Sequence, residues 1–250
     1  MHDTCVGSQG HFVIFTQTKS LKMIFQMKET LFDLCALGLV EEVRTALASG
    51  EDVNKQNHSN HTPLMAAAVN SDCENHVLVL KLLLEQPGID VNLADKQENT
   101  ALTHATIRGH IEAAKLLLND PRLDVNWMNS TGFSALHKAA MKEKGNVKMM
   151  ELLLAHPRVN VNCKKGPYGT TVLHVAATQN RLDMVRLILA EPRFTSVNAL
   201  EVDKNFIERT AITTAAALRH WDLLRELVHH PSIDLDVKNT SGLAIDDILR

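Results

Sequence analysis

Histidine and cysteine are the residues with the most potential for chemistry in this 250-residue sequence, which contains thirteen histidines and four cysteines. Imidazoles and thiolates bind transition metals, and histidine also acts as a general acid or base. His58 and His61 lie three residues apart, as metal ligands in a loop could, but no nearby cysteine or carboxylate completes the ligand set. We therefore interpret this pair as part of a solvated turn and predict no metal site.

The cysteines show no spacing typical of a zinc site or a disulfide framework. Cys5, Cys35, Cys73 and Cys163 are scattered along the chain. We expect them to be reduced thiols of a cytoplasmic protein, with the nucleus as the alternative location. The sequence also lacks a glycine-rich phosphate loop, a zinc-protease helix and a nucleophile elbow. It therefore predicts a protein that is not an enzyme and binds no cofactor.

The elements that would position any site are clearest in residues 98–130. Thr100 occupies a helix N-cap position, and Gly109 supplies the left-handed residue that ends a short helix. Residues 111–118 then carry the apolar stripe of a second helix, and Pro121 prevents its continuation. The stretch predicts a helix, a tight turn, a second helix and a loop, a unit too short to bury its own apolar face.

This unit recurs along the chain, which is typical of a stacked array. The valine of the exit loop recurs at similar spacing, at Val53, Val91, Val125, Val161, Val197 and Val237. The repeats fall near residues 28–56, 57–96, 97–129, 130–165, 166–204 and 205–238. Residues 239–250 are predicted to be a C-terminal cap, and residues 1–27 an N-terminal extension that is disordered or partly helical. Each repeat would bury its apolar face against its neighbours.

Prolines and turn residues mark the ends of these helices. Five of the seven prolines occupy one slot after the second helix, at Pro87, Pro121, Pro157, Pro192 and Pro231. In the turn between the two helices, Asn180 of the fifth repeat replaces glycine, and asparagine tolerates the left-handed region. Arg219 takes this place in the sixth repeat, where we expect a strained or differently built turn.

The repeated motifs resemble those of the ankyrin-repeat family over about residues 28–250. The family pattern Thr-Pro-Leu-His-x-Ala is matched by TPLMAA at 62–67, SALHKA at 134–139 and TVLHVA at 171–176. The family turn is matched by Gly109-His110 and Gly145-Asn146, and its Asp-Val-Asn exit occurs at 52–54, 90–92 and 124–126. The resemblance implies an all-α ankyrin-repeat solenoid of stacked helix-turn-helix pairs with projecting hairpin loops.

The resemblance also implies roles for individual residues. In similar repeats the imidazole of the Leu-His-x-Ala motif hydrogen-bonds the backbone of the neighbouring hairpin loop, a role that falls to His137 and His174. The asparagine of Asp-Val-Asn is a target of asparaginyl hydroxylation in similar repeats, and its position is occupied here by Asn54, Asn92, Asn126 and Asn162. Hydrogen bonding in the turn is the alternative role for these four residues.

The function that the resemblance implies is protein binding, as a scaffold or adaptor. The hairpin loops, here called fingers, would form a concave groove together with the first helices. Aromatic and arginine side chains are enriched in interface hot spots, and such residues gather on the fingers between repeats 3 and 6 and on the adjacent helices. The candidate partner-binding residues are Trp127, Met128, Phe133, Lys164, Lys165, Tyr168, Leu200, Phe206, Ile207, Arg108 and Lys138.

The same residues have a second interpretation, in which they serve packing and solubility. Trp127 and Phe133 would then fold back against each other or against the next finger, and Arg108 and Lys138 would belong to a solvated polar face. The net charge of −3 and the lack of a long basic run argue against nucleic acid or a membrane as the partner. We expect a monomer that binds another protein.

Three other functions are consistent with such a binding protein. The chain could be an inhibitor that masks a transcription factor or kinase. It could be the substrate-recognition part of a ubiquitin ligase, although such an adaptor would carry a further helical box after its repeats. It could also be the targeting region of a larger enzyme or secreted effector, but the residues before the first repeat are too few for a catalytic domain.

Overall fold

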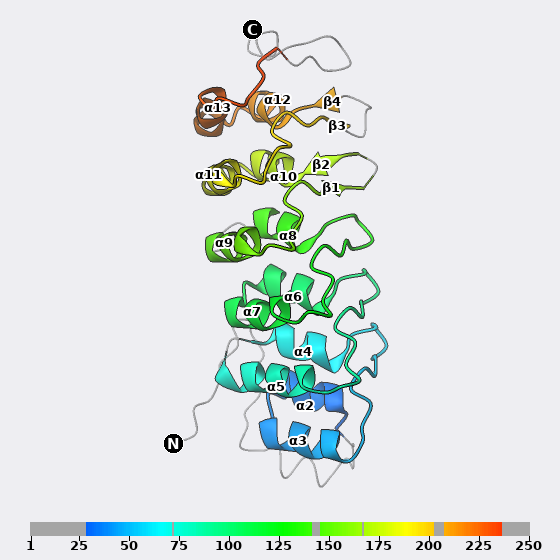
Figure 1. Cartoon of the computed structure of the whole chain (residues 1–250). Helices are drawn as coiled ribbons and strands as arrows, with labels where there is room; N and C mark the ends of the chain where they lie inside the picture. Colours follow the sequence, from blue (N-terminus) through cyan, green and yellow to red (C-terminus); the bar gives the residue numbers. More distant parts are fainter. Residues whose placement is uncertain (1–28, 72, 142–145, 167, 203–207, 237–250) are drawn as a thin grey trace.

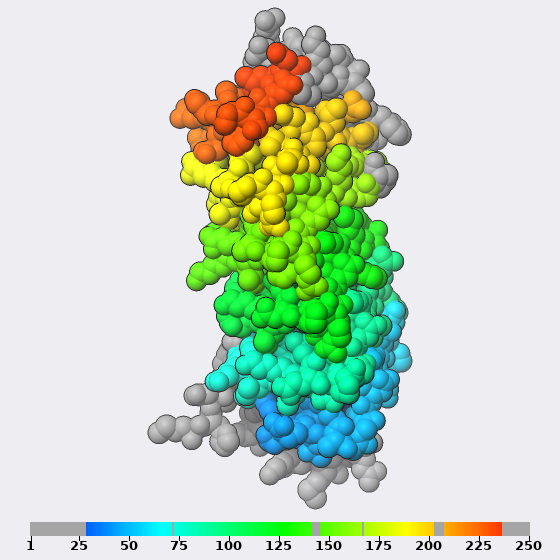
Figure 2. Space-filling model, viewed as in Figure 1, coloured from blue at the N-terminus to red at the C-terminus, as the bar shows by residue number. Residues whose placement is uncertain are grey.

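The computed structural model describes residues 29–71, 73–141, 146–166, 168–202 and 208–236, and within them the chain forms a single stack of helix pairs (Figure 1). The predicted N-terminal extension at 1–27 and the predicted C-terminal cap at 239–250 lie outside the described residues. In the space-filling view, the repeats succeed one another in chain order along an elongated body (Figure 2). The fold is an ankyrin-like solenoid, as predicted.

The helices form two columns. The inner column, next to the fingers, consists of α2 (Leu31–Leu37), α4 (Pro63–Val69), α6 (Ala101–Arg108), α8 (Ala135–Met141), α10 (Val172–Thr178) and α12 (Ala211–Ala217). The outer column consists of α3 (Val40–Ala48), α5 (Glu74–Leu84), α7 (Ile111–Leu118), α9 (Val147–Ala155), α11 (Leu182–Ala190) and α13 (Trp221–Val228). Successive helices of each column are in contact. Within the described ranges, no helix has the length and hydropathy required to cross a membrane.

The fingers connect each outer helix to the next inner helix and project from one side of the stack (Figure 1). We number them from the N-terminus as residues 55–61, 93–99, 127–133, 164–171 and 200–209. The fourth finger contains the antiparallel pair β1 (Lys164–Lys165) and β2 (Thr170–Thr171), in which Lys164 faces Thr171. The fifth contains the antiparallel pair β3 (Glu201–Val202) and β4 (Glu208–Arg209).

Local sequence signals set the helix ends as expected. Thr62 and Thr100 are N-caps in extended conformation, and the hydroxyl of each accepts the backbone N–H three residues later. Gly109 ends α6 with a φ of 84°. Asn180 and Arg219 take the same left-handed turn position with φ values of 52° and 59°. The Arg219 turn is therefore built like the others and carries the strain of a non-glycine residue with positive φ.

The core is a continuous row of leucine and alanine side chains between the two columns. The middle leucine of each Leu-Leu-Leu run, Leu83, Leu117 and Leu153, is completely buried. Alanines of the inner helices, such as Ala105 and Ala139, are also fully buried. Because an alanine side chain is a single methyl group, neighbouring inner helices can approach closely there, and the leucines fill the space behind them.

Two rows of side chains bind each repeat to the next. The asparagine after each exit valine donates its amide to a carbonyl of the next repeat, in the pairs Asn54–Gly88, Asn92–Arg122, Asn126–Arg158, Asn162–Arg193 and Asn198–Ser232. The second row consists of three of the residues whose backbone carbonyls accept these asparagine amides. Their guanidinium groups donate back to carbonyls of the preceding repeat, Arg122 to Leu84, Arg158 to Leu118 and Arg193 to Leu154. The sequence analysis did not predict the arginine row.

Candidate protein-binding surface

Backbone hydrogen bonds and one close backbone contact join successive fingers into a row. A backbone N–H group of one finger donates to a carbonyl of the finger before it in three places. These bonds run from Lys96 to Ser59 (3.2 Å), from Ser130 to Gln97 (3.2 Å) and from Val202 to Tyr168 (2.8 Å). The third and fourth fingers approach closely at Gly132, where an added Cβ would lie 2.8 Å from the backbone nitrogen of Gly166. Side chains on this row are therefore held in fixed relative positions.

Trp127 lies against the second finger rather than standing free. Its indole N–H donates to the carbonyl of Glu98 at 2.8 Å, and its side chain is half-buried. Glu98 itself has a φ of 59°, so this finger turn is left-handed at a non-glycine residue. Trp127 therefore ties two fingers together and can offer only part of its surface to a partner. Met128, the next residue, is also half-buried.

Phe133 forms a compact unit with two lysines. The ammonium groups of Lys165 and Lys138 lie 3.8 Å and 4.6 Å from the centre of the phenyl ring, at cation–π distances. The ring meets His137 edge to face, with centroids 6.1 Å apart. Burial lowers the pKa of Lys138, and the positive charge of Lys165 lowers it further. Phe133 is thus packed against the core, and it holds two positive charges at the finger side of α8.

The remaining candidate residues divide into exposed and undescribed positions. Tyr168 and Leu200 are 48% and 36% exposed, and they lie on the adjacent fourth and fifth fingers. Lys164 and Arg108 are exposed. Phe206 and Ile207 lie outside the described residues. The structure thus brings Lys138 and Lys165 to the ring of Phe133, and Lys164 and Tyr168 lie on the same finger as Lys165. We call these five residues, Phe133, Lys138, Lys164, Lys165 and Tyr168, the Phe133 patch.

His137 and His174 take the inter-repeat role that the resemblance implies. The Nε2–H of His137 donates to the carbonyl of Thr170 at 3.2 Å, and Nδ1 accepts from the Ser134 hydroxyl at 2.9 Å. His174 repeats this arrangement with the carbonyl of Arg209 at 3.1 Å. Burial lowers the pKa of His137 to about 4, so the imidazole is neutral at physiological pH. These histidines position the fingers rather than perform chemistry.

Other histidines brace the opposite end of the inner helices. Each donates a ring N–H to a carbonyl near the end of the preceding inner helix, in the pairs His76–Ala36 (3.0 Å), His110–Val69 (2.8 Å) and His220–Ala177 (2.9 Å). Gly145 of the corresponding fourth turn lies outside the described residues, but Asn146 donates to the carbonyl of Thr106 at 3.1 Å in the same way. Several histidines of the chain therefore serve as hydrogen-bond donors to backbone carbonyls of a neighbouring repeat.

The described cysteines are free thiols. Cys35 and Cys163 are buried, and burial raises the pKa of Cys35 to about 12. A thiol with such a pKa holds its proton and is a poor nucleophile or metal ligand. Cys5 lies outside the described residues.

The asparagines expected to be hydroxylation targets use both ends of their amides. In addition to donating to the next repeat, each of them accepts a backbone N–H from it, as Asn126 does from Asn160 at 2.7 Å. Asn198 behaves in the same way with Ser232 and Asp234, and it is a fifth asparagine of this kind, which the sequence analysis did not predict. The sequence signal for it was weak because Ser-Val-Asn replaces Asp-Val-Asn there.

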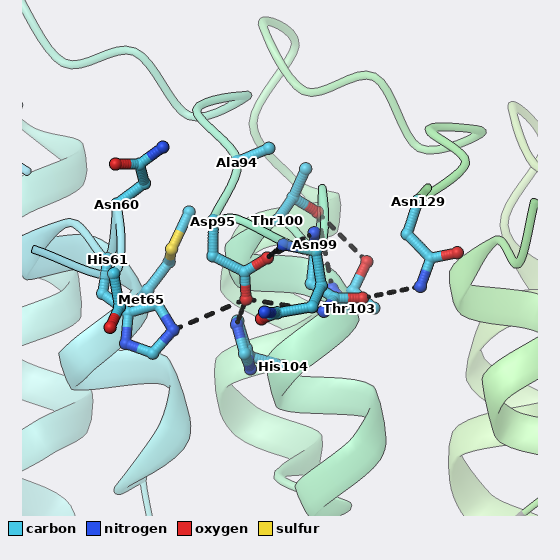
Figure 3. Close-up of polar contacts among 12 residues, drawn as sticks. Asn60, His61, Met65, Ala94, Asp95, Asn99, Thr100, Thr103, His104 and Asn129 are labelled. Carbon is cyan, nitrogen blue, oxygen red and sulfur yellow. Dashed lines mark hydrogen bonds and ion pairs between the residues drawn. The ribbon is translucent and has the colours of Figure 1, made fainter. Parts of the chain in front are cut away.

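One group of potential metal ligands was not predicted. Asp95 of the second finger lies between His61 of the first finger and His104 of α6 (Figure 3). The carboxylate oxygen Oδ2 is 2.8 Å from Nε2 of His104 and 3.5 Å from Nε2 of His61. The interpretation that no carboxylate accompanies His61 is therefore wrong. Sequence spacing hid the group because its members belong to two successive repeats.

The largest exposed aromatic side chain also escaped the sequence analysis. Trp221, the first residue of α13, is 58% exposed on the outer column. It lies on the other side of the stack from the fingers, so it does not extend the Phe133 patch. Its position at a helix start, outside the repeat motifs, gave no signal for a role.

Comparison with known proteins agrees with the geometry. A family model described as ankyrin repeats in three copies matches residues 31–127, 121–200 and 158–241. The chain is similar in structure to the ankyrin repeat domain of Bcl-3, a member of the IkappaB protein family, with a TM-score of 0.77 and 23% identity over 89% of this chain and 94% of that one. It is also similar to the ankyrin repeat domain of human ASB11, with a TM-score of 0.66 and 25% identity over 89% of this chain and 92% of that one.

Proposed function

Since this chain belongs to the ankyrin-repeat family, whose repeats are a general protein–protein interaction module, we propose that it is a scaffold or adaptor that binds another protein through its finger side. It acts without catalysis or cofactor, as a monomer in the cytoplasm or nucleus, and uses neither nucleic acid nor membrane as partner. The net charge of −3 supports the last two points.

The observation that carries this proposal is the Phe133 patch. Two ammonium groups lie over one aromatic ring, with the exposed Tyr168 and Lys164 on the neighbouring finger. Rigid aromatic side chains next to cations are typical of binding hot spots, because the ring buries area at low entropic cost and the cations donate charge-assisted hydrogen bonds to a partner's carboxylates. A partner segment that carries carboxylates beside apolar side chains complements this patch.

We expect substitution of the patch to remove the specific partner. The variant with Lys164→Glu, Lys165→Glu and Tyr168→Ala reverses two charges and truncates one aromatic, and it should lower the affinity at least about tenfold. Affinity purification of tagged protein followed by quantitative mass spectrometry measures the loss. The control variant, Lys81→Glu with Lys148→Glu, reverses two exposed charges on the outer helices α5 and α9.

The comparison of these variants decides the proposal. An interactor that is retained by the control and lost by the patch variant supports binding through the finger side. Equal recovery from both variants, with unchanged circular dichroism, would place the binding surface elsewhere. The complex of this protein with its captured partner separates the alternatives. An inhibitor blocks the activity of a captured transcription factor or kinase. A ubiquitin-ligase adaptor is captured together with ligase subunits.

The second functional proposal is that the four asparagines of the exit motif are hydroxylated, since similar repeats are hydroxylated at this position. Asn54, Asn92, Asn126 and Asn162 present the same amide geometry, with both amide ends bonded to the next repeat. An enzyme must open that contact to reach the side chain, so hydroxylation should be fastest where a repeat opens most easily.

We expect tryptic peptides that contain these residues to gain the mass of one oxygen atom when the protein is made in eukaryotic cells. The equivalent Asn198, which follows Ser-Val rather than Asp-Val or Asn-Val, serves as the internal comparison. Peptides without the added oxygen at all four positions would contradict the proposal.

A further inference from the structure

We propose that His61, Asp95 and His104 form a zinc-binding site at the junction of the first and second fingers. The site supplies two imidazole nitrogens and one carboxylate oxygen, and it leaves a fourth position open to water or to a donor from a partner. This goes beyond protein binding through the Phe133 patch, because the site lies on the first two fingers and α6 and uses different residues.

The three ligand atoms already lie close to the geometry of a tetrahedral zinc site. All of them are within 4.8 Å of one another. In a tetrahedral site with metal–ligand distances of about 2.0–2.1 Å, the ligand atoms lie about 3.4 Å apart. The distance from Asp95 Oδ2 to His61 Nε2 is 3.5 Å, and that to His104 Nε2 is 2.8 Å. Small side-chain rotations therefore suffice to admit the ion.

Asp95 is held as a ligand with one oxygen available. Its Oδ1 accepts the backbone N–H groups of Gln97 (2.8 Å) and Asn99 (2.9 Å), which fixes the carboxylate plane. Its Oδ2 is directed toward the two imidazoles, as Figure 3 shows, and it also lies 3.4 Å from the side-chain nitrogen of Asn99. The side chain is 1% exposed, so this carboxylate is a buried, hydrogen-bonded negative charge that a bound cation would stabilise further.

The two histidines come from separate, well-anchored elements. The backbone N–H of His61 donates to the Asn57 side chain at 3.0 Å, which closes the first finger. His104 lies in the first turn of α6, where its N–H donates to the carbonyl of Thr100 at 3.0 Å. The two rings meet nearly at right angles, with centroids 5.4 Å apart. Ligands on rigid supports need little reorganisation to bind an ion.

The donor set selects the kind of ion. Two imidazoles and a single carboxylate suit zinc and related transition metals, whereas magnesium and calcium prefer sites made of oxygen donors. The bound ion would join the first finger to the second across the repeat junction, in addition to the backbone bond from Lys96 to Ser59.

Isothermal titration of chelator-treated protein with zinc chloride tests the site. We expect one ion per chain in the wild type, and binding at least about 100-fold weaker in His104→Gln and His61→Gln. The control is His58→Gln, which changes an exposed imidazole of the same finger that lies outside the group. Cobalt(II) provides a second readout, since its visible absorption intensifies in four-coordinate sites. That absorption should appear in the wild type and be lost in His61→Gln.

The outcomes separate a metal site from a hydrogen-bonded cluster. Failure of the wild type to bind zinc more tightly than about 1 mM, or equal affinity in all three variants, would overturn the proposal and leave only imidazole–carboxylate hydrogen bonds. Circular dichroism of each metal-free variant confirms that it is folded. His61 is 35% exposed, so His61→Gln should keep the fold and test the site even if His104→Gln does not.

Discussion

Acidification from about pH 7 to pH 4 is expected to cost the native array about 3 kcal/mol through His137 alone. Burial lowers the pKa of this histidine to about 4, from an ordinary value of 6.5. Between these two values the unfolded chain binds a proton that the native protein excludes, so stability falls as the pH falls. One pKa unit corresponds to about 1.4 kcal/mol. The contribution is complete above the ordinary value and is lost by about pH 4.

The main physical cause is the burial of the ring, which disfavours its charged form, and the hydrogen bonds of the ring leave no acceptor for a second proton. Nε2–H already donates to the carbonyl of Thr170, and Nδ1 accepts from the hydroxyl of Ser134, so a second ring proton would face a donor. Lys165 also disfavours a positive charge there. Burial lowers the pKa of His174 as well, and it should add to the same trend.

Urea unfolding curves at a series of pH values measure this loss. His137→Gln should be less stable than the wild type near neutrality, and its stability should fall less steeply between about pH 6.5 and pH 4. His58→Gln, at an exposed position, should retain the wild-type slope. The same slope in all three proteins would show that burial of His137 does not govern the acid sensitivity.

Replacement of Arg158 by alanine is expected to lower the free energy of unfolding by about 2–3 kcal/mol. Its guanidinium donates to four carbonyls at the end of the preceding repeat, of Leu118, Asp120, Pro121 and Leu123, at 2.9–3.2 Å. Hydrogen bonds from charged groups contribute about 1.5–3 kcal/mol each, but carbonyls near the surface regain water when the arginine is removed. The net effect is therefore smaller than the sum.

Chemical denaturation followed by circular dichroism measures the change. Arg158→Lys should recover only part of the loss, because an ammonium group cannot reach several carbonyls in the plane that the guanidinium spans. Lys148→Ala, at an exposed position of α9, should change stability by less than about 0.5 kcal/mol. Indistinguishable stability of Arg158→Ala and Lys148→Ala would mean that this row contributes nothing measurable.

The elements of the fold were predictable because their signals are local. Thr100 caps α6, Gly109 ends it, and Pro121 follows the end of α7, each through backbone chemistry within one repeat. The predicted role of His137 came from the family resemblance, and the structure shows its bond to Thr170 in the next finger.

The parts that sequence could not predict depend on contacts between repeats. Asp95 of the second finger meets His61 of the first finger, and Trp127 of the third finger meets Glu98 of the second. No nearby carboxylate completes a ligand set with His58 and His61 in the sequence, whereas a stacked array brings together residues about one repeat apart. The direction of the Trp127 side chain likewise depends on a left-handed turn at Glu98, a position where glycine is the usual residue.

The arginine row has a mechanical consequence. Its members brace the junctions that follow the second, third and fourth repeats, where the amides of Asn92, Asn126 and Asn162 donate to Arg122, Arg158 and Arg193. At the equivalent position the terminal junctions carry Gly88 and Ser232, which have no guanidinium. Under tension along its axis, an array built in this way should resist extension more at its three central junctions than at its two terminal ones. The outer repeats would peel away first, and the segment with the Phe133 patch would keep its shape longest.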